Sequence, residues 1–166
     1  RVAAEDFAPF NMLSSIRSAS ELVREPMTAK GVILEDKVET PVRVVGNAIQ
    51  FEQVLINMIN NARDAILTTA SSGVITLRQS IDQEYVTVMI ADTGGAIPLD
   101  VLPHVFEPFY TTKPVGKGTG LGGSISYGII QDMQGSIWAE NTQKGAQISI
   151  RLPLSDGAHD PRVEEE

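Results

Sequence analysis

The spacing of apolar residues predicts two helices in the first half of the chain. Between Phe10 and Glu25 the apolar positions recur every three or four residues, which is the period of an amphipathic helix. We expect this helix to end at Pro26, because proline has no N–H for the helix ladder. A longer pattern of the same period runs from about Ala48 to Leu67 and predicts a second helix.

Six short segments rich in β-forming residues predict strands. They read VILEDKVE, VRVVG, GVITLRQSI, YVTVMIADT, GSIWAE and AQISIRLP. The third and fourth flank the turn formers Asp82 and Gln83, and the last two flank the turn NTQKG, so each pair predicts an antiparallel hairpin. A proline-broken loop and a third, glycine-led helix lie between the hairpins. This order predicts an α/β fold, an α+β two-layer sandwich with one mixed sheet covered on one face by helices.

Composition narrows the class of protein. With 166 residues the chain is sized for one domain, and it has no apolar run near the roughly 18 residues that a membrane span needs. A formal charge of −8 argues against a surface that binds nucleic acid. Without cysteine there can be no disulfide, thiolate catalysis or cysteine-ligated metal, and two histidines are too few for a histidine metal cage. We therefore expect a domain that contacts neither nucleic acid nor membrane.

The second predicted helix carries an unusual polar face. Its polar residues Gln53, Asn57, Asn61 and Asp64 line up opposite the apolar ones. A solvated face is the ordinary explanation, but asparagine lowers helix propensity because its short amide competes for the backbone. Two asparagines one turn apart offer carbonyl oxygens that a hydrated divalent cation and its phosphates could bridge. The pattern therefore favours a binding face.

Asp92 stands at the end of an apolar strand, directly before a glycine turn, in the stretch MIADTGGAIP. Starting a turn by bonding its own backbone is the commoner role of aspartate in this context. In a partly apolar pocket the carboxylate could instead accept a hydrogen bond from an exocyclic amine. Adenine would suit such an acceptor, whereas guanine presents an oxygen at that place. The sequence leaves both roles open.

The glycine-rich stretch GKGTGLGGS opens the third predicted helix. It is not a dinucleotide-binding fingerprint, because no strand precedes it, and it is not a P-loop, because Lys117 is followed by Gly118. What remains is a segment from Tyr110 to Gly116, carrying threonines and a lysine, that could close over an anion at the start of the helix. A flexible surface loop explains the same composition equally well.

Taken in order, these stretches resemble the motifs of the ATP-binding catalytic domain of bacterial sensor histidine kinases, in the GHKL or HATPase_c superfamily. QVLINMINNARDA resembles the N box, DTGGAIP the G1 box, FEPF the F box, GTGLGG the G2 box and KGAQISIRLP the closing strand. The resemblance spans roughly Ile33 to Leu154. Within it, NARDA and FEPFYTTKPVGKGTGLG look most like the nitrogen- and dicarboxylate-sensing type. It implies a Bergerat-type mixed β-sheet with an ATP lid.

The resemblance also implies a site for ATP and Mg²⁺. Asn61 would ligate the Mg²⁺ that bridges the phosphates, with Asn57 assisting through water or phosphate. Asp92 would read the adenine amino group. Lys113 would be the lid cation on the γ-phosphate, with Lys117 as second candidate, and Asn57 and Lys113 are the implied catalytic residues. The other implied nucleotide contacts are Asp64, Gly94, Ala96, Ile97, Thr111, Thr112, Gly118, Thr119, Gly120, Leu121 and Gly122.

The residue at position 57 separates the relatives within this superfamily. Gyrase, mismatch-repair and heat-shock ATPases have a similar fold but carry a glutamate at the position of Asn57. In those enzymes the glutamate carboxylate activates water for hydrolysis. An amide cannot take up a proton near neutral pH. The resemblance therefore implies a protein-histidine kinase, in which this domain transfers the γ-phosphoryl group by positioning and charge neutralisation.

The implied organisation has three parts: a linker or the end of a dimerisation helix at 1–9, the catalytic domain at 10–154, and a flexible acidic tail at 155–166. Neither His104 nor His159 has the acidic neighbour of the family's acceptor histidine. We expect that acceptor on a separate dimerisation domain of the same kinase, in a homodimer, with a response regulator receiver domain as second partner. The expected location is the cytoplasm, as a separate protein or as the cytoplasmic part of an inner-membrane sensor.

Two residues depart from the family pattern. Ala96 stands where the third glycine of the G1 box is usual, and Gly123 stands where the G2 box usually has a large aliphatic residue. A positive φ at Ala96, or added backbone freedom at Gly123, would each cost about 1 kcal/mol, so we expect weaker nucleotide affinity than in a typical relative. The departures also leave open a degenerate ATP-binding or docking module without phosphotransfer. A serine kinase of the anti-sigma type is a third alternative, which FEPF and TTK disfavour.

Overall fold

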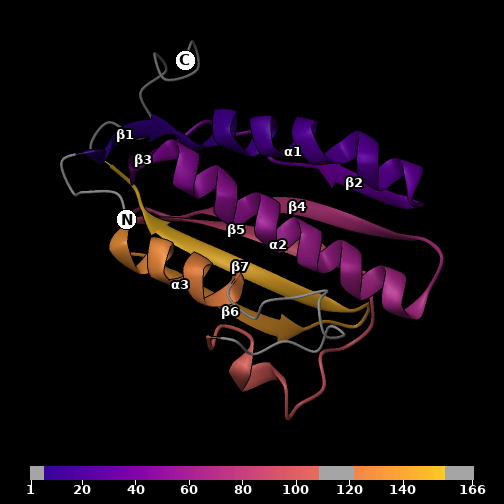
Figure 1. The fold of residues 1–166 in the computed structure, drawn as a ribbon. Helices are drawn as coiled ribbons and strands as arrows, with labels where there is room; N and C mark the ends of the chain where they lie inside the picture. Colours follow the sequence, from indigo (N-terminus) through magenta and orange to yellow (C-terminus); the bar gives the residue numbers. More distant parts are fainter. Residues whose placement is uncertain (1–5, 109–121, 156–166) are drawn as a thin grey trace.

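Three helices and seven strands form the described part of the molecule (Figure 1). The structure is a computed structural model, and it describes residues 6–108 and 122–155. In chain order its elements are β1 (Ala8–Asn11), α1 (Met12–Ala29), β2 (Val32–Asp36), β3 (Arg43–Gly46), α2 (Ala48–Thr69), β4 (Gly73–Ile81), β5 (Tyr85–Asp92), a 3₁₀ turn (Leu102–His104), α3 (Gly122–Asp132), β6 (Ser136–Asn141) and β7 (Ala146–Pro153). Within this described part, no helix has the length and apolar character needed to span a membrane.

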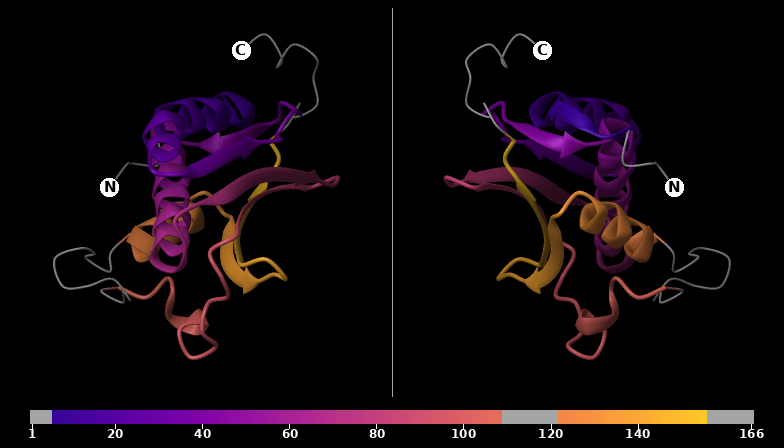
Figure 2. Two further views of the ribbon diagram at one scale, coloured as in Figure 1. Left: turned by 90° about the vertical axis from the view of Figure 1, so that its right-hand side faces the viewer. Right: turned by 90° about the vertical axis from the view of Figure 1, so that its left-hand side faces the viewer.

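A five-stranded mixed sheet with the strand order β2-β4-β5-β7-β6 forms the centre of the fold. β2 runs parallel to β4, whereas the two predicted hairpins, β4–β5 and β6–β7, are antiparallel and are joined by the antiparallel pair β5–β7. Side chains of β5 alternate between buried and half-buried, because successive residues of a strand point to opposite faces. Figure 2 shows the three helices on one side of this sheet. The predicted two-layer α/β fold is therefore confirmed.

The prediction of a single sheet is wrong for β3. This strand pairs antiparallel with β1 in a separate two-stranded sheet, in which Phe10 lies opposite Val44. The centroids of the Phe10 and Phe51 rings are 5.7 Å apart, so the small sheet packs on the first turn of α2. The sequence does not predict β1, because the residues around Pro9 show no alternation of apolar and polar positions.

The predicted end of the first helix at Pro26 is also wrong, because α1 continues to Ala29. Proline at this position removes only the bond that its N–H would donate to the carbonyl of Leu22, one turn earlier. The side chain of Leu22 is 66% exposed, so water can reach this part of the helix. Met27 is 1% exposed and holds the last turn in the core. The packing of that turn outweighs the loss of one hydrogen bond.

The buried face of α2 fixes the direction of its polar face. Asn47 caps the helix by accepting a hydrogen bond of 3.0 Å from the N–H of Gln50. The predicted apolar face lies in the core, and its buried members are Phe51, Leu55, Met58, Ile59, Ala62 and Ile66. Burial of each large side chain contributes about 1.5–3 kcal/mol, so a rotation of the helix would be costly. The polar face is therefore held away from the core, and its residue Asn57 meets α3.

Candidate functional site

Asn57 lies where α2 meets the beginning of α3. Its Nδ2 donates a hydrogen bond of 3.2 Å to Oγ of Ser126, a side chain that is buried in α3. A Cβ on Gly122 would lie 2.6 Å from the same Nδ2, so a larger residue at 122 would displace the Asn57 side chain. Two predicted site residues from distant motifs, Asn57 and Gly122, are therefore neighbours in the structure. Asn61 lies one turn further along α2 and is exposed.

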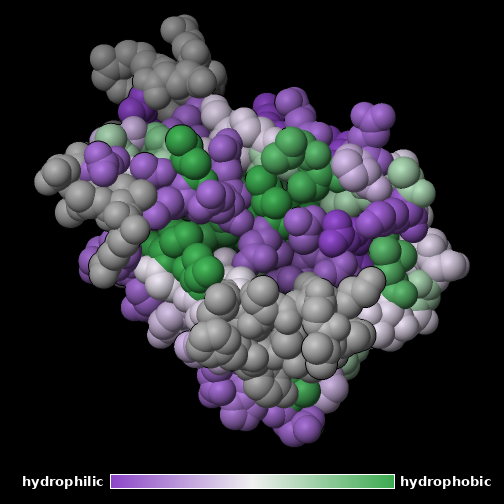
Figure 3. Space-filling view, in the orientation of Figure 1, coloured by the Kyte–Doolittle hydropathy of each residue, from purple (hydrophilic) through white to green (hydrophobic). Residues whose placement is uncertain are grey.

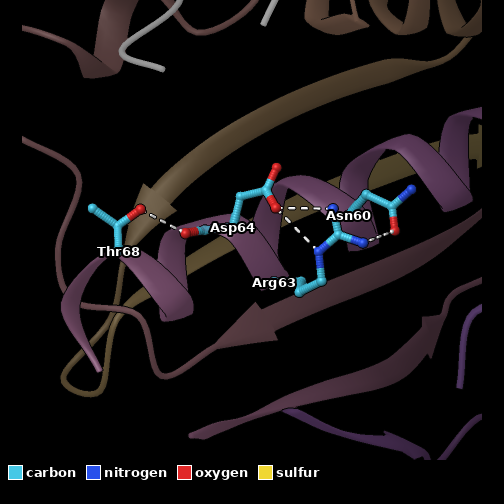
Figure 4. Close-up of polar contacts among 4 residues, drawn as sticks. All are labelled: Asn60, Arg63, Asp64 and Thr68. Carbon is cyan, nitrogen blue, oxygen red and sulfur yellow. Dashed lines mark hydrogen bonds and ion pairs between the residues drawn. The ribbon is translucent and has the colours of Figure 1, made fainter. Parts of the chain in front are cut away.

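Asp64, the next predicted residue on this face, is bound by its neighbour Arg63 (Figure 4). Nε and Nη2 of the guanidinium group donate to Asp64 Oδ1 at 3.0 and 2.9 Å, and Nη1 donates to Asn60 Oδ1 at 3.3 Å. Thr68 Oγ1 donates to the carbonyl oxygen of Asp64 at 2.7 Å. Arg63 offsets the negative charge of Asp64, which would otherwise repel a phosphate near this face. That Asp64 contacts nucleotide stays a prediction.

Asp92 ends β5 as a buried carboxyl group, 8% exposed. Its Oδ1 accepts a hydrogen bond of 2.8 Å from the N–H of Gly94, as expected of a turn starter. Burial raises the pKa of the Asp92 carboxyl, and the backbone N–H groups of Gly94 and Ala146 oppose that rise. The Asp92 carboxyl group thus starts the turn. It is also desolvated, unlike the carboxyl group of a turn-forming aspartate on the surface. Both roles considered for Asp92 are compatible with this geometry.

The turn after Asp92 needs glycine at two positions. A Cβ on Gly94 would lie 2.8 Å from the backbone nitrogen of Ile66 in α2, and Gly95 has a φ of +87°. Thr69 Oγ1, at the end of α2, donates to the carbonyl oxygen of Gly94 at 3.2 Å. Gln134, and not Ala96, is the non-glycine residue with positive φ in the described ranges. The expected backbone penalty at Ala96 is therefore absent, and that part of the prediction of weak affinity is corrected.

Asn141 is a residue at this turn that the sequence does not single out. Its Oδ1 accepts a hydrogen bond of 2.7 Å from the N–H of Ile97, and its Nδ2 donates one of 3.0 Å to the carbonyl oxygen of Ile97. In the sequence it opens the stretch NTQKG and has the composition of an ordinary turn former. The position of Asn141 at the end of a strand that lies beside the G1 box would have indicated its role, but the sequence does not show which strands are neighbours.

Gly123 has a packing role that the sequence does not show. A Cβ at this position would clash with the carbonyl oxygen of Val105, in the loop before α3. The same loop is held against α3 by Phe106, whose ring centroid lies 6.3 Å from that of Tyr127. The space that a side chain at position 123 would need is therefore occupied by the backbone of Val105. The effect of Gly123 on nucleotide affinity stays a prediction.

Gly123→Leu is expected to lower the unfolding temperature by several degrees, because overpacking at a close contact costs about 1–3 kcal/mol. The matched control is Gly128→Ala in the same helix, where a Cβ meets no atom within 4 Å. That control is expected to raise the unfolding temperature slightly, because alanine favours helix over glycine. Thermal unfolding followed by circular dichroism measures both variants. An unchanged midpoint for Gly123→Leu would contradict the contact with Val105.

Eight predicted site residues lie outside the described residues. They are Thr111, Thr112, Lys113, Lys117, Gly118, Thr119, Gly120 and Leu121. The predicted lid, with its cation candidates, therefore stays a prediction. The described residues that border this segment are Pro108, in the loop before α3, and Gly122, in α3.

The residues present fit a Mg²⁺ ion that arrives on a nucleotide better than one held by protein alone. The described ranges, 6–108 and 122–155, contain no group of three or more histidine, aspartate or glutamate side chains that could hold a metal. Mg²⁺ prefers oxygen ligands, keeps several waters and is commonly bound through substrate phosphates plus one or two protein groups. The exposed amide of Asn61 can supply one such oxygen. A site of this kind is complete only when phosphates are present.

Comparison with known proteins gives a family match over most of the chain. Residues 46–156 match the model of the histidine kinase-, DNA gyrase B-, and HSP90-like ATPases. The two-component sensor PprA of Pseudomonas aeruginosa is 38% identical over 162 residues, which cover 93% of this chain and 17% of that protein. The C4-dicarboxylate transport sensor protein DctB of Rhizobium meliloti is 36% identical over 110 residues, which cover 66% of this chain and 17% of that protein. The chain therefore spans about a sixth of these relatives.

Solved structures give the same result for the fold. The catalytic domain of histidine kinase ThkA in a nucleotide-free form superimposes with a TM-score of 0.78 and 32% identity, covering 89% of this chain and 97% of that one. A structure of ThkA in complex with the response regulator protein TrrA gives a TM-score of 0.74 and 29% identity, covering 90% of this chain and 42% of that one. The fold of this chain is therefore that of a histidine kinase catalytic domain.

Proposed function

This chain belongs to the histidine kinase-, DNA gyrase B-, and HSP90-like ATPase family, and on that premise we propose that it transfers the γ-phosphoryl group of ATP to a histidine on a separate dimerisation domain. The observation that carries the proposal is the amide of Asn57, held by Ser126 at the junction of α2 and α3. Hydrolytic relatives have a carboxylate at this position to activate water. An amide there leaves water unactivated, and a neutral imidazole needs little help from a base.

The proposed mechanism assigns each residue a role in binding or orientation. Asp92 would accept a hydrogen bond from the adenine amino group, and Asn61 would hold Mg²⁺ through its amide oxygen. When bound, Mg²⁺ neutralises charge on the phosphate oxygens, which is most of what phosphoryl transfer requires of a protein. Lys113 would place a further positive charge at the γ-phosphate. The bond from the γ-phosphorus to its bridging oxygen breaks, ADP keeps the electron pair, and a P–N bond forms to the imidazole.

The proposed partners are the dimerisation domain that carries the acceptor histidine and a response regulator receiver domain. The complex of ThkA with a response regulator supports the second partner. The nitrogen- or dicarboxylate-sensor subtype remains part of the proposal, and the similarity to the C4-dicarboxylate transport sensor protein DctB supports it. We place the whole protein, as a homodimer, with this domain in the cytoplasm, where ATP is available. The catalytic domain would extend over 10–154.

The structure removes one of the two observations that favoured a degenerate docking module and gives a packing role to the other. Ala96 has no positive φ, and Gly123 accommodates the carbonyl of Val105. The amides of Asn57 and Asn61 and the carboxyl group of Asp92 are all present, and Asn57 contacts α3 through Ser126. Phosphotransfer is therefore the function that we put to the test.

We expect the isolated chain to bind ATP with Mg²⁺ but not to label itself with phosphate. His104 contacts Glu107, with 2.8 Å between Nδ1 and Oε1, but its sequence neighbour is Val105 and not the acidic residue of the acceptor box. Incubation with γ-labelled ATP, alone and with the matching dimerisation domain, is the measurement. Label should appear on the dimerisation domain only, and α-labelled ATP should give none. Label on this chain would overturn the expectation, and its loss in His104→Ala would assign the label to that histidine.

A further inference from the structure

The loop that follows Asp92 is contacted at both of its ends by residues at the tip of the β6–β7 hairpin. This segment, residues 92–97, is called the Asp92 loop below. At its beginning, Gly145 lies against Asp92, since a Cβ on Gly145 would clash with the carbonyl oxygen of Asp92, and the backbone N–H of Ala146 lowers the pKa of the Asp92 carboxyl group. At its end, the side chain of Asn141 bonds both backbone groups of Ile97.

The two contact points lie opposite each other on the hairpin. Asn141 and Ala146 are Cα partners in the last rung of the antiparallel pair β6–β7. The turn between them is closed by a hydrogen bond of 2.9 Å from the N–H of Thr142 to the carbonyl oxygen of Gly145, and the N–H of Gly145 returns one of 3.1 Å to Thr142 Oγ1. The hairpin end therefore presents Asn141 and Ala146 at a fixed separation.

The orientation of the Asn141 amide is determined by its partner. A backbone N–H requires an oxygen and a backbone carbonyl requires an N–H, so the oxygen and nitrogen of this side chain cannot exchange places. The middle of the loop, at Gly95 and Ala96, is exposed. Its shape depends mainly on how its ends are held, because exposed loop residues have few packed neighbours to order them.

We infer that Asn141 is a positioning residue for nucleotide recognition: it fixes the distance between the Asp92 carboxyl group and the backbone of Ile97, and so the shape of the base pocket. The inference rests on the proposed nucleotide site. Asn141 holds a part of that pocket without touching the phosphates, which are assigned to α2 and the lid. Its removal should change how well the base is read and leave the stability of the free protein almost unchanged, since its two bonds lie at the surface.

The test compares Asn141→Ala with Gln143→Ala, an exposed residue of the same turn. Isothermal titration calorimetry gives the dissociation constants for ATP, ADP and GTP, and thermal unfolding gives the stability of the free proteins. Asn141→Ala should weaken ATP and ADP binding by the same factor, about 5- to 30-fold. It should also reduce the preference for ATP over GTP, while the unfolding temperature stays close to that of the unaltered protein. Gln143→Ala should behave as the unaltered protein in all measurements.

Each other outcome has a definite meaning. If Asn141→Ala binds ATP and GTP as the unaltered protein does, the inference is overturned. A lower unfolding temperature with an unchanged preference between ATP and GTP would assign Asn141 to stability alone and would overturn it as well. Should Asn141→Ala fail to fold, Asn141→Asp keeps the acceptor for the N–H of Ile97 and should show a smaller change in the same direction. Failure of the unaltered protein to bind ATP would instead refute the proposed function.

Discussion

Replacing Asp92 by asparagine is expected to weaken ATP binding about tenfold or more while leaving the free protein at least as stable as before. The loss of a hydrogen bond to a charged group inside a site costs about 1.5–3 kcal/mol, which corresponds to about a 10- to 100-fold change in affinity. The free protein should not suffer, because burial makes the ionised carboxylate unfavourable there. Calorimetry with ATP and thermal unfolding without it are the two measurements.

The dependence on pH follows from the direction of the pKa shift. The pKa of the Asp92 carboxyl is raised in the folded protein, so on raising the pH the unfolded chain releases this proton first. Its contribution to the stability of the free protein is therefore fully present below the ordinary pKa and falls as the pH rises through the raised value. ATP affinity should change in the opposite direction, because an amine donor favours the ionised carboxylate. Asp92→Asn should remove both dependences.

Asp82→Asn is the matched control. Asp82 lies in the β4–β5 turn, where the N–H groups of Glu84 and Tyr85 lower the pKa of its carboxyl group. Its loss should slightly destabilise the free protein at neutral pH and leave ATP affinity unchanged. The two substitutions should thus have opposite effects on stability. Equal ATP affinities for Asp92→Asn and the unaltered protein would mean that Asp92 only starts the turn.

Asn61→Ala is expected to reduce phosphotransfer to the dimerisation domain by about a hundredfold or more. The amide oxygen of Asn61 is the proposed protein ligand of Mg²⁺, and neutralisation of phosphate charge by a metal contributes several kcal/mol to the transition state. The rate of labelling should be measured over a range of Mg²⁺ concentrations. In the variant, half-maximal labelling should require more Mg²⁺, whereas the unfolding temperature should change little because the side chain is exposed.

The control for this prediction is Asn60→Ala, one residue earlier on the same helix. Asn60 accepts a hydrogen bond from Arg63 (Figure 4) and has no proposed contact with the metal. Its loss should leave the dependence on Mg²⁺ unaltered. If Asn61→Ala also retained the normal dependence on Mg²⁺, the metal would have to be held by other groups, and the role proposed for α2 would be wrong.

The polar face of α2 could be predicted from sequence because its two determinants are local. The helical period places Phe51 and Leu55 on one side and Asn57 and Asn61 on the other, and the core accepts the apolar side without conflict. The two hairpins could be predicted for the same reason, since a short turn and the alternation of apolar and polar residues mark both strands of each hairpin. In these elements local preference and global fold agree.

The features that were missed depend on contacts between distant segments. β1 acquires its structure by pairing with β3, and α1 continues past Pro26 because Met27 is buried. The role of Asn141 depends on the approach of a strand end to Ile97, which no local pattern encodes. Gly123 is explained only by the position of Val105. The motifs therefore predict which residues contact the ligand, but not which other residues position them.

The surface of the molecule also carries residues that no motif of the site includes. Figure 3 shows apolar patches in green between hydrophilic residues over the helices, and exposed apolar side chains such as Leu22 and Ile49 lie on that layer. Neither residue belongs to a motif of the site. Scattered exposed apolar residues are normal for a folded protein and require no functional explanation.

The contact between Gly123 and Val105 has a consequence for chimaeric proteins. The carbonyl of Val105 occupies the space that a side chain at position 123 would need, so a larger residue at 123 requires a different path of the loop at Val105. A chimaera that takes only the G2 box from a relative with a large aliphatic residue at position 123 would place that side chain against the unchanged loop at Val105. Exchange of modules between this chain and its relatives should therefore join the sequences before Val105 and after α3, so that both positions move together.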